Sequence, residues 1–115
     1  MIRAVLYRAG KDLTGCRLEG HSGWDEEGKD IVCAGASILT CSCVNTLEAV
    51  YGIVPRIREE DAEKGILAFD LPERTEAENE KAQVLMSMLR QGLDDLMKEY
   101  PDNVTLSIKE RRKQP

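Results

Sequence analysis

Apolar and polar residues alternate over the first twenty positions of the chain, which predicts a pair of strands. Ile2, Ala4 and Leu6 share one face of residues 2–8, because successive side chains of a strand point to opposite sides. A second alternating run follows at 13–20, after a turn that contains glycine. The chain is therefore expected to open with a β-hairpin.

A period of three to four residues then replaces the alternation and predicts an amphipathic helix. The helix is expected to begin after Asp30, because an aspartate side chain caps the free amides of a first turn. It is expected to end near Tyr51, where Gly52 favours termination and Pro55 forbids continuation. The expected apolar stripe consists of Val32, Ala36, Leu39, Cys43, Leu47 and Val50.

A second helix is predicted from Thr75 to the residue before Pro101. Thr75 and Glu78 have the spacing of a capping box, in which each residue bonds the main chain of the other. The expected buried stripe consists of Ala82, Leu85, Leu89, Leu93, Leu96 and Tyr100.

The remaining segments complete the predicted order ββαββαβ. Residues 55–60 and 65–71 predict a second hairpin, and the alternation over 104–108 predicts a last strand. Hairpins interleaved with two amphipathic helices favour an α+β fold, a two-layer sandwich in which both helices cover one face of a mainly antiparallel sheet. The length predicts one domain, 1–115.

Composition and charge narrow the classes of partner. Apolar residues make up 42% and charged residues 32% of the chain, which is typical of a globular domain. The net charge of −5 repels phosphate backbones, so we expect a basic polypeptide as partner and no direct nucleic acid. No export signal and no apolar stretch of about 18 residues is evident, so we expect no membrane partner. The expected compartment is the cytoplasm, where thiols stay reduced.

His21 and Cys33 are the candidate catalytic pair. His21 is the only histidine, and it lies where the second predicted strand runs into a glycine-bearing loop. Cys33 would be the third residue of the first helix, where free amides and the helix dipole favour a thiolate. A thiolate beside an imidazole suits nucleophilic catalysis, and amides near Cys33 are candidates for binding the oxyanion. The same spacing also fits a cysteine that only packs in the core.

The other cysteines favour packing over chemistry. Cys16 and Cys43 fall on apolar faces of a predicted strand and helix, and Cys41 points to a different face from Cys43. No Cys-x-x-Cys pair occurs, so no metal site is expected.

Three further residues have two interpretations each. Asp30 either orients the imidazole of His21 or only caps the helix, and the two roles are compatible. Ser37 lies one turn beyond Cys33 and either hydrogen-bonds in the site or allows close packing. Trp24 either grips an apolar substrate or folds down onto the domain.

The residues around the candidate pair match a known pattern. Gly-His-Ser-Gly at 20–23, followed by Gly-Lys-Asp-Ile-Val-Cys-Ala-Gly-Ala-Ser at 28–37, resembles the ribosomal-processing cysteine protease family Prp, also called YsxB-like. The match joins a Gly-His loop entry to a Gly-x-Asp-Ile-Val-Cys-Ala helix start at the family's separation. Length and element order agree over essentially the whole chain.

This resemblance implies a bacterial cysteine endopeptidase and homodimer that works without a cofactor. The implied substrate is large-subunit ribosomal protein number twenty-seven, whose short N-terminal extension is removed by a cut after paired phenylalanines. Cys33 is implied to be the nucleophile and His21 its histidine, with Asp30 and Ser37 in support. The segment 22–29 is implied to order over the substrate. The residues of that substrate loop are Ser22, Gly23, Trp24 and Gly28.

A second function remains open on the sequence alone. A non-catalytic module that binds a basic ribosomal or ribosome-assembly protein through the same cleft would explain the acidic charge equally well. In that case Cys33 would not react, so thiol reactivity separates the two hypotheses.

Overall fold

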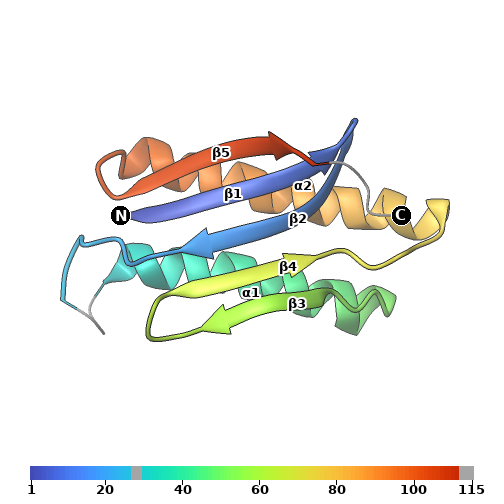
Figure 1. The fold of residues 1–115 in the computed structure, drawn as a ribbon, viewed down its shortest axis with the longest axis horizontal. Helices are drawn as coiled ribbons and strands as arrows, with labels where there is room; N and C mark the ends of the chain where they lie inside the picture. The colour runs from blue at the N-terminus through green and yellow to red at the C-terminus, as the bar shows by residue number, and fades with distance from the viewer. Residues whose placement is uncertain (27–29, 112–115) are drawn as a thin grey trace.

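The computed structural model of the protein describes residues 1–26 and 30–111. Its elements follow the predicted order ββαββαβ, and their bounds lie within a few residues of the expected ones (Figure 1). The strands are β1 (Ile2–Ala9), β2 (Asp12–Glu19), β3 (Arg56–Asp61), β4 (Ile66–Asp70) and β5 (Val104–Glu110). The helices are α1 (Ile31–Tyr51) and α2 (Glu76–Glu99).

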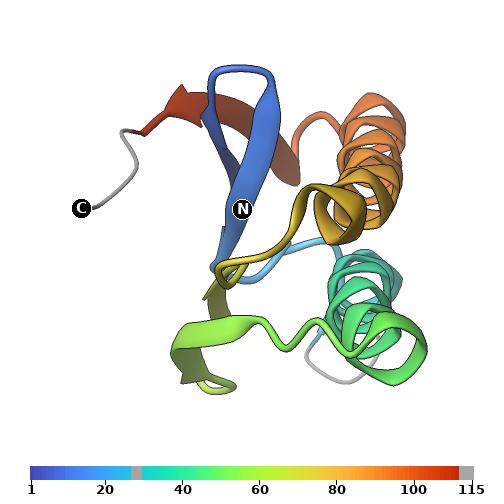
Figure 2. The ribbon, with the colours of Figure 1, turned by 90° about the vertical axis from the view of Figure 1, so that its right-hand side faces the viewer.

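The five strands form one mixed sheet in the order β3-β4-β2-β1-β5. All neighbouring strands are antiparallel except β1 and β5, which are parallel because α2 carries the chain back along the sheet before β5. Both helices lie on the same face of the sheet, and the opposite face carries neither of them (Figure 2). The predicted α+β sandwich of two layers is confirmed.

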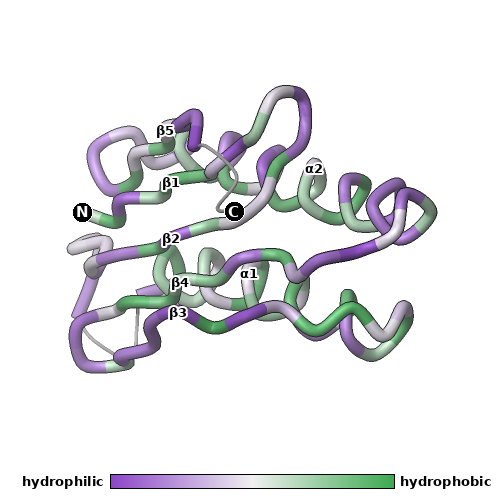
Figure 3. The backbone as a smooth tube through the Cα atoms, turned by 45° about the vertical axis from the view of Figure 1, so that its right-hand side comes forward, coloured by the Kyte–Doolittle hydropathy of each residue, from purple (hydrophilic) through white to green (hydrophobic). Residues whose placement is uncertain are grey.

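The core lies between the sheet and the helices. The faces predicted for the first hairpin are buried, since Leu6 and Cys16 are fully covered and their neighbours on the same faces nearly so. Hydrophobic residues recur along β1 and α1 in Figure 3, whereas β3 is mostly hydrophilic. This edge strand is charged and exposed over most of its length, which discourages pairing with another chain.

The buried stripe of α1 differs from the predicted stripe at its end. The residues that are buried as predicted are Val32, Ala36, Cys43 and Leu47. Val50 is 63% exposed, so its assignment was wrong, because the buried stripe ends one turn earlier. Thr40 is buried instead, and its hydroxyl donates to the carbonyl of Ala36 at 2.9 Å, which satisfies the polar group without solvent.

In α2 the predicted buried stripe agrees only in part with the residues that are buried. Ala82, Leu89 and Leu93 are fully buried as predicted. Met86 is also fully buried but was not predicted, whereas Leu85 is only half-buried. Helix α2 packs against both the sheet and α1, so its inner surface is wider than a single stripe.

Helix α1 corrects the expectation about membrane-spanning segments. Its 21 residues are long and apolar enough to cross a membrane by length and composition alone. The statement that the chain has no apolar stretch of about 18 residues was therefore wrong. The helix passes this test because Glu48 is its only charged residue. In the structure five of its residues form a buried stripe within the core, whereas Ile31, Ile38 and Val50 are exposed.

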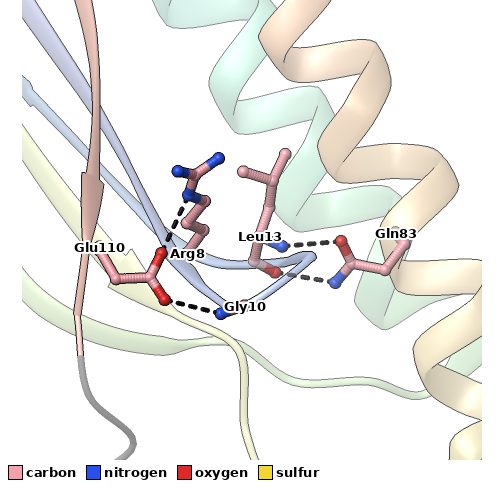
Figure 4. Close-up of polar contacts among 5 residues, drawn as sticks. All are labelled: Arg8, Gly10, Leu13, Gln83 and Glu110. Carbon is pink, nitrogen blue, oxygen red and sulfur yellow. Dashed lines mark hydrogen bonds and ion pairs between the residues drawn. The ribbon is translucent and has the colours of Figure 1, made fainter.

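Polar side chains fix the first hairpin to the rest of the fold (Figure 4). The side-chain amide of Gln83 in α2 donates to the carbonyl of Leu13 and accepts from its amide, both at 2.8 Å. On the other side, the carboxylate of Glu110 accepts from Arg8 at 2.9 Å and from the amide of Gly10 at 2.8 Å. The hairpin is thereby joined to α2 and to the end of β5.

We expect Gly15→Ala to destabilise the protein by about 1–3 kcal/mol. A Cβ at Gly15 would overlap the carboxylate of Asp70 and lie 2.8 Å from the carbonyl oxygen of Phe69, which is main chain and cannot move aside cheaply. The matched control is Gly35→Ala in α1, where the nearest atom, on Leu96, would be 3.7 Å away. This control is expected to gain about 0.5–1 kcal/mol from helix propensity. Urea unfolding measures both changes, and equal stabilities would contradict the prediction.

Candidate active site

A cleft of about 540 Å³ lies between the amino-terminal half of α1 and the turn that joins β3 to β4. Its walls come from segments far apart in the sequence, and both His21 and Cys33 line it. Many of its walls are apolar, with contributions from Ile2, Leu18, Ala34, Ile66 and Leu67. The cleft therefore offers an apolar surface next to the predicted catalytic pair.

Cys33 occupies the first turn of α1 and is half-buried. Its Sγ accepts a hydrogen bond from the main-chain amide of Ser22 at 3.1 Å. Because Ser22 directly follows His21, standard bond lengths place the Cα of His21 within about 5.5 Å of that sulfur. The structure thus brings the main chain of His21 against the candidate nucleophile.

Asp30 caps the helix, as predicted. Its Oδ1 accepts from the amides of Val32 and Cys33, each at 3.0 Å, and its Oδ2 accepts from the hydroxyl of Ser22. Burial raises the pKa of Asp30, but hydrogen bonds from Ser22, from Cys33 and from the Asp25 amide outweigh it and hold the pKa below its usual value. The contacts of Oδ1 match the capping role, and Oδ2 joins the cap to Ser22.

The imidazole of His21 has its partner on the β3–β4 turn. Its Nε2 lies 2.8 Å from the carbonyl oxygen of Glu63, and the amide of the preceding Gly20 donates to the carbonyl of Gly65 at 3.2 Å. Gly65 has a φ of +67°, and any side chain there would collide with Gly20. Glycine at this position allows the turn to approach the end of β2 closely.

The amides expected to bind an oxyanion are already engaged. Those of Val32 and Cys33 donate to the carboxylate of Asp30, and that of Ala34 donates to its carbonyl at 3.1 Å. The amide of Ser22 points at Sγ instead. The sequence carried no signal for this donor, because the loop geometry that aims it depends on contacts distant in the chain.

Ser22 belongs to an anchored part of the predicted substrate loop. It is only 2% exposed, and its carbonyl accepts from the side chain of Asn103 at 3.0 Å. Trp24 packs edge-on against Tyr100 with ring centroids 6.1 Å apart and remains 43% exposed. Gly23 lines the cleft, and Gly28 lies outside the described residues.

Ser37 and Cys41 follow Cys33 at intervals of about one turn on the same side of α1. Both are exposed and line the cleft. Cys41 lies on a different face of the helix from the buried Cys43, as predicted. Cys16 and Cys43 are buried, as expected from their apolar positions. Burial raises the pKa of Cys16 to about 12, with a further contribution from Cys43, and raises that of Cys43 to about 11.

Known proteins are similar to this chain in sequence and in fold. A family model described as cysteine protease Prp matches residues 1–105. The ribosomal processing cysteine protease Prp of Bacillus subtilis (strain 168) is 28% identical over 109 residues, which are 93% of this chain and 96% of that protein.

Two solved structures are similar over nearly the whole chain. The crystal structure of SMU.848 from Streptococcus mutans is 32% identical with a TM-score of 0.83, covering 96% of each chain. The essential ribosomal processing protease Prp from S. aureus, in complex with a covalently linked product peptide, is 27% identical with a TM-score of 0.83. That alignment covers 95% of this chain and 100% of the other.

We expect Asp30→Asn to lower the free energy of unfolding at neutral pH by about 1–3 kcal/mol, because hydrogen bonds to a charged acceptor are lost. The pKa of Asp30 in the folded protein lies below its usual 3.8. Its contribution is therefore complete above about pH 4 and is lost as the pH falls through the folded value. Urea unfolding over this range should show the difference between the two proteins shrinking in acid. A pH-independent difference would argue against an ionised cap.

Thiol alkylation of the native protein is expected to modify two of the four cysteines. At neutral pH iodoacetamide should label Cys33 and Cys41, which line the cleft, and spare Cys16 and Cys43, whose raised pKa values and burial suppress the thiolate. Peptide mapping by mass spectrometry identifies the sites, and unfolding in denaturant should expose all four. Labelling of Cys16 before Cys33 would contradict this arrangement.

Proposed function

The chain belongs to the cysteine protease Prp family, and from that membership we propose that it is a cysteine endopeptidase with Cys33 as nucleophile and His21 as base. The observation that carries the proposal is the hydrogen bond from the Ser22 amide to Sγ of Cys33, 3.1 Å long. It holds the residue after the histidine against the sulfur, inside a cleft that both residues line.

In the proposed reaction, the imidazole of His21 takes the proton from the thiol of Cys33. The thiolate attacks the scissile carbonyl carbon, and a carbon–sulfur bond forms as the carbonyl oxygen becomes an oxyanion. The Ser22 amide, which donates to Sγ of Cys33, is the donor we assign to that oxygen. The imidazolium then protonates the amine as the carbon–nitrogen bond breaks, which leaves a thioester on Cys33. Water, deprotonated by the imidazole, hydrolyses the thioester and restores the thiol.

We assign as substrate the short N-terminal extension of large-subunit ribosomal protein number twenty-seven, cut after paired phenylalanines. The apolar walls of the cleft suit aromatic side chains. Asp25, Glu60 and Asp61 also line it, and these carboxylates favour a basic polypeptide such as a ribosomal protein. The names of the relatives in B. subtilis and S. aureus support ribosomal processing. We further propose that the enzyme acts as a homodimer in the cytoplasm.

Cys33→Ala and His21→Ala are each expected to abolish cleavage of a peptide that carries the extension with its two phenylalanines. The first variant lacks the nucleophile, and the second lacks the base that activates it, which contributes on the order of 100-fold or more. Mass spectrometry of the peptide products measures the rate. Ser42→Ala, an exposed position on the same helix that does not line the cleft, serves as the matched control and should retain the full rate.

Retained cleavage in Cys33→Ala would refute the assignment of the nucleophile. If the native protein binds the peptide but yields no product, the chain is instead a binding module of the kind described above. In that case Cys33→Ala would bind the peptide as tightly as the native protein does, and calorimetry would show it.

A further inference from the structure

The contact between His21 and Glu63 determines which ring nitrogen carries the proton. The carbonyl oxygen of Glu63 can only accept, so a hydrogen bond at 2.8 Å requires that Nε2 of His21 be the donor. In a neutral imidazole only one nitrogen bears hydrogen, so Nδ1 then carries the lone pair. The main chain of the β3–β4 turn thus selects one tautomer of the histidine.

We propose that the carbonyl of Glu63 positions the catalytic imidazole and holds it in the tautomer whose Nδ1 is the base for Cys33. This inference rests on the proposed function of the Cys33 site. The main-chain carbonyl takes the place that a carboxylate has in a Ser-His-Asp triad, where it orients the ring and fixes its tautomer.

The geometry of the side chain agrees with this assignment. Nδ1 is the ring nitrogen nearer to the main chain, and the main chain of His21 is held beside the sulfur of Cys33 through the Ser22 amide. The nitrogen left with its lone pair is therefore the one that the turn does not engage. Nε2 is directed to the turn.

Asp30 has other partners in this arrangement. Its two carboxylate oxygens accept hydrogen bonds from Ser22, Val32 and Cys33. Asp30 therefore holds the main chain of Cys33, and the carbonyl of Glu63 holds the imidazole of His21.

The turn that presents the carbonyl is itself held in place. The amide of Lys64 donates to the side chain of Asp61 at 3.1 Å, and the amide of Gly65 donates to the carbonyl of Ala62 at 3.3 Å. Gly65 also contacts the His21 segment closely, since a Cβ there would overlap Gly20 and lie 3.3 Å from Cε1 of the imidazole. A substitution at Gly65 therefore moves the carbonyl relative to the ring.

The first test reads the tautomer directly. His21 is the only histidine, so the native protein labelled with ¹⁵N-histidine gives one imidazole in the NMR spectrum. At a pH where the ring is neutral, we expect the proton on Nε2 and a nonprotonated Nδ1. A proton on Nδ1, or equal averaging of the two tautomers, would overturn the proposal. This measurement needs no substrate, so its outcome is independent of whether the peptide is cleaved.

The second test compares two glycines that both have a positive φ, Gly65 and Gly10. Gly65→Ala should lower kcat on the peptide by on the order of 10- to 100-fold with little change in KM, and should average the two tautomers. Gly10→Ala is the matched control, because Gly10 has a φ of +60° but open space around its Cβ position, so both readouts should stay native. Loss of the tautomer preference in Gly65→Ala without loss of kcat would refute the positioning role. Should that variant fail to fold, the tautomer of the native protein decides alone.

Discussion

The carboxylate of Asp30 accepts hydrogen bonds from two segments that have to meet for the cleft to exist. One oxygen accepts the amides of Val32 and Cys33 at the start of α1, and the other accepts the hydroxyl of Ser22 at the end of the β2 segment. The carboxylate is nearly buried, so it would be costly to leave without these partners. Through it, the beginning of the helix and the residue after His21 become one rigid unit.

The sheet supplies the second constraint on this unit. Leu18 of β2 is paired with Leu67 of β4, and this register brings Gly20 opposite Gly65 at the end of the two strands. The β3–β4 turn consequently reaches the imidazole of His21. The nucleophile is thus held by the helix cap and the histidine by the sheet, and Ser22 connects the two supports.

The elements of the fold could be predicted because their signals are local. The alternation of Ile2, Ala4 and Leu6 and the caps at Asp30 and Thr75 lie within a few residues of the structure they specify. The errors fall where burial depends on neighbours distant in sequence. Val50 has the right period for the core but lies in the last turn, past the buried stripe, and α1 is apolar enough to resemble a membrane span although one side of it packs in the core.

Residue type and short-range spacing were enough to predict the cap at Asp30 and the order of the elements, and the motif around His21 and Cys33 predicted the candidate pair. The partners of that pair, the amide of Ser22 on the sulfur and the carbonyl of Glu63 on the imidazole, are evident only in the folded chain. Every residue has a main-chain carbonyl and every residue except proline has a main-chain amide, so a sequence does not show which of them matter. Which of them reaches the site depends on strand register and loop path, and these are set by the packing of the whole chain.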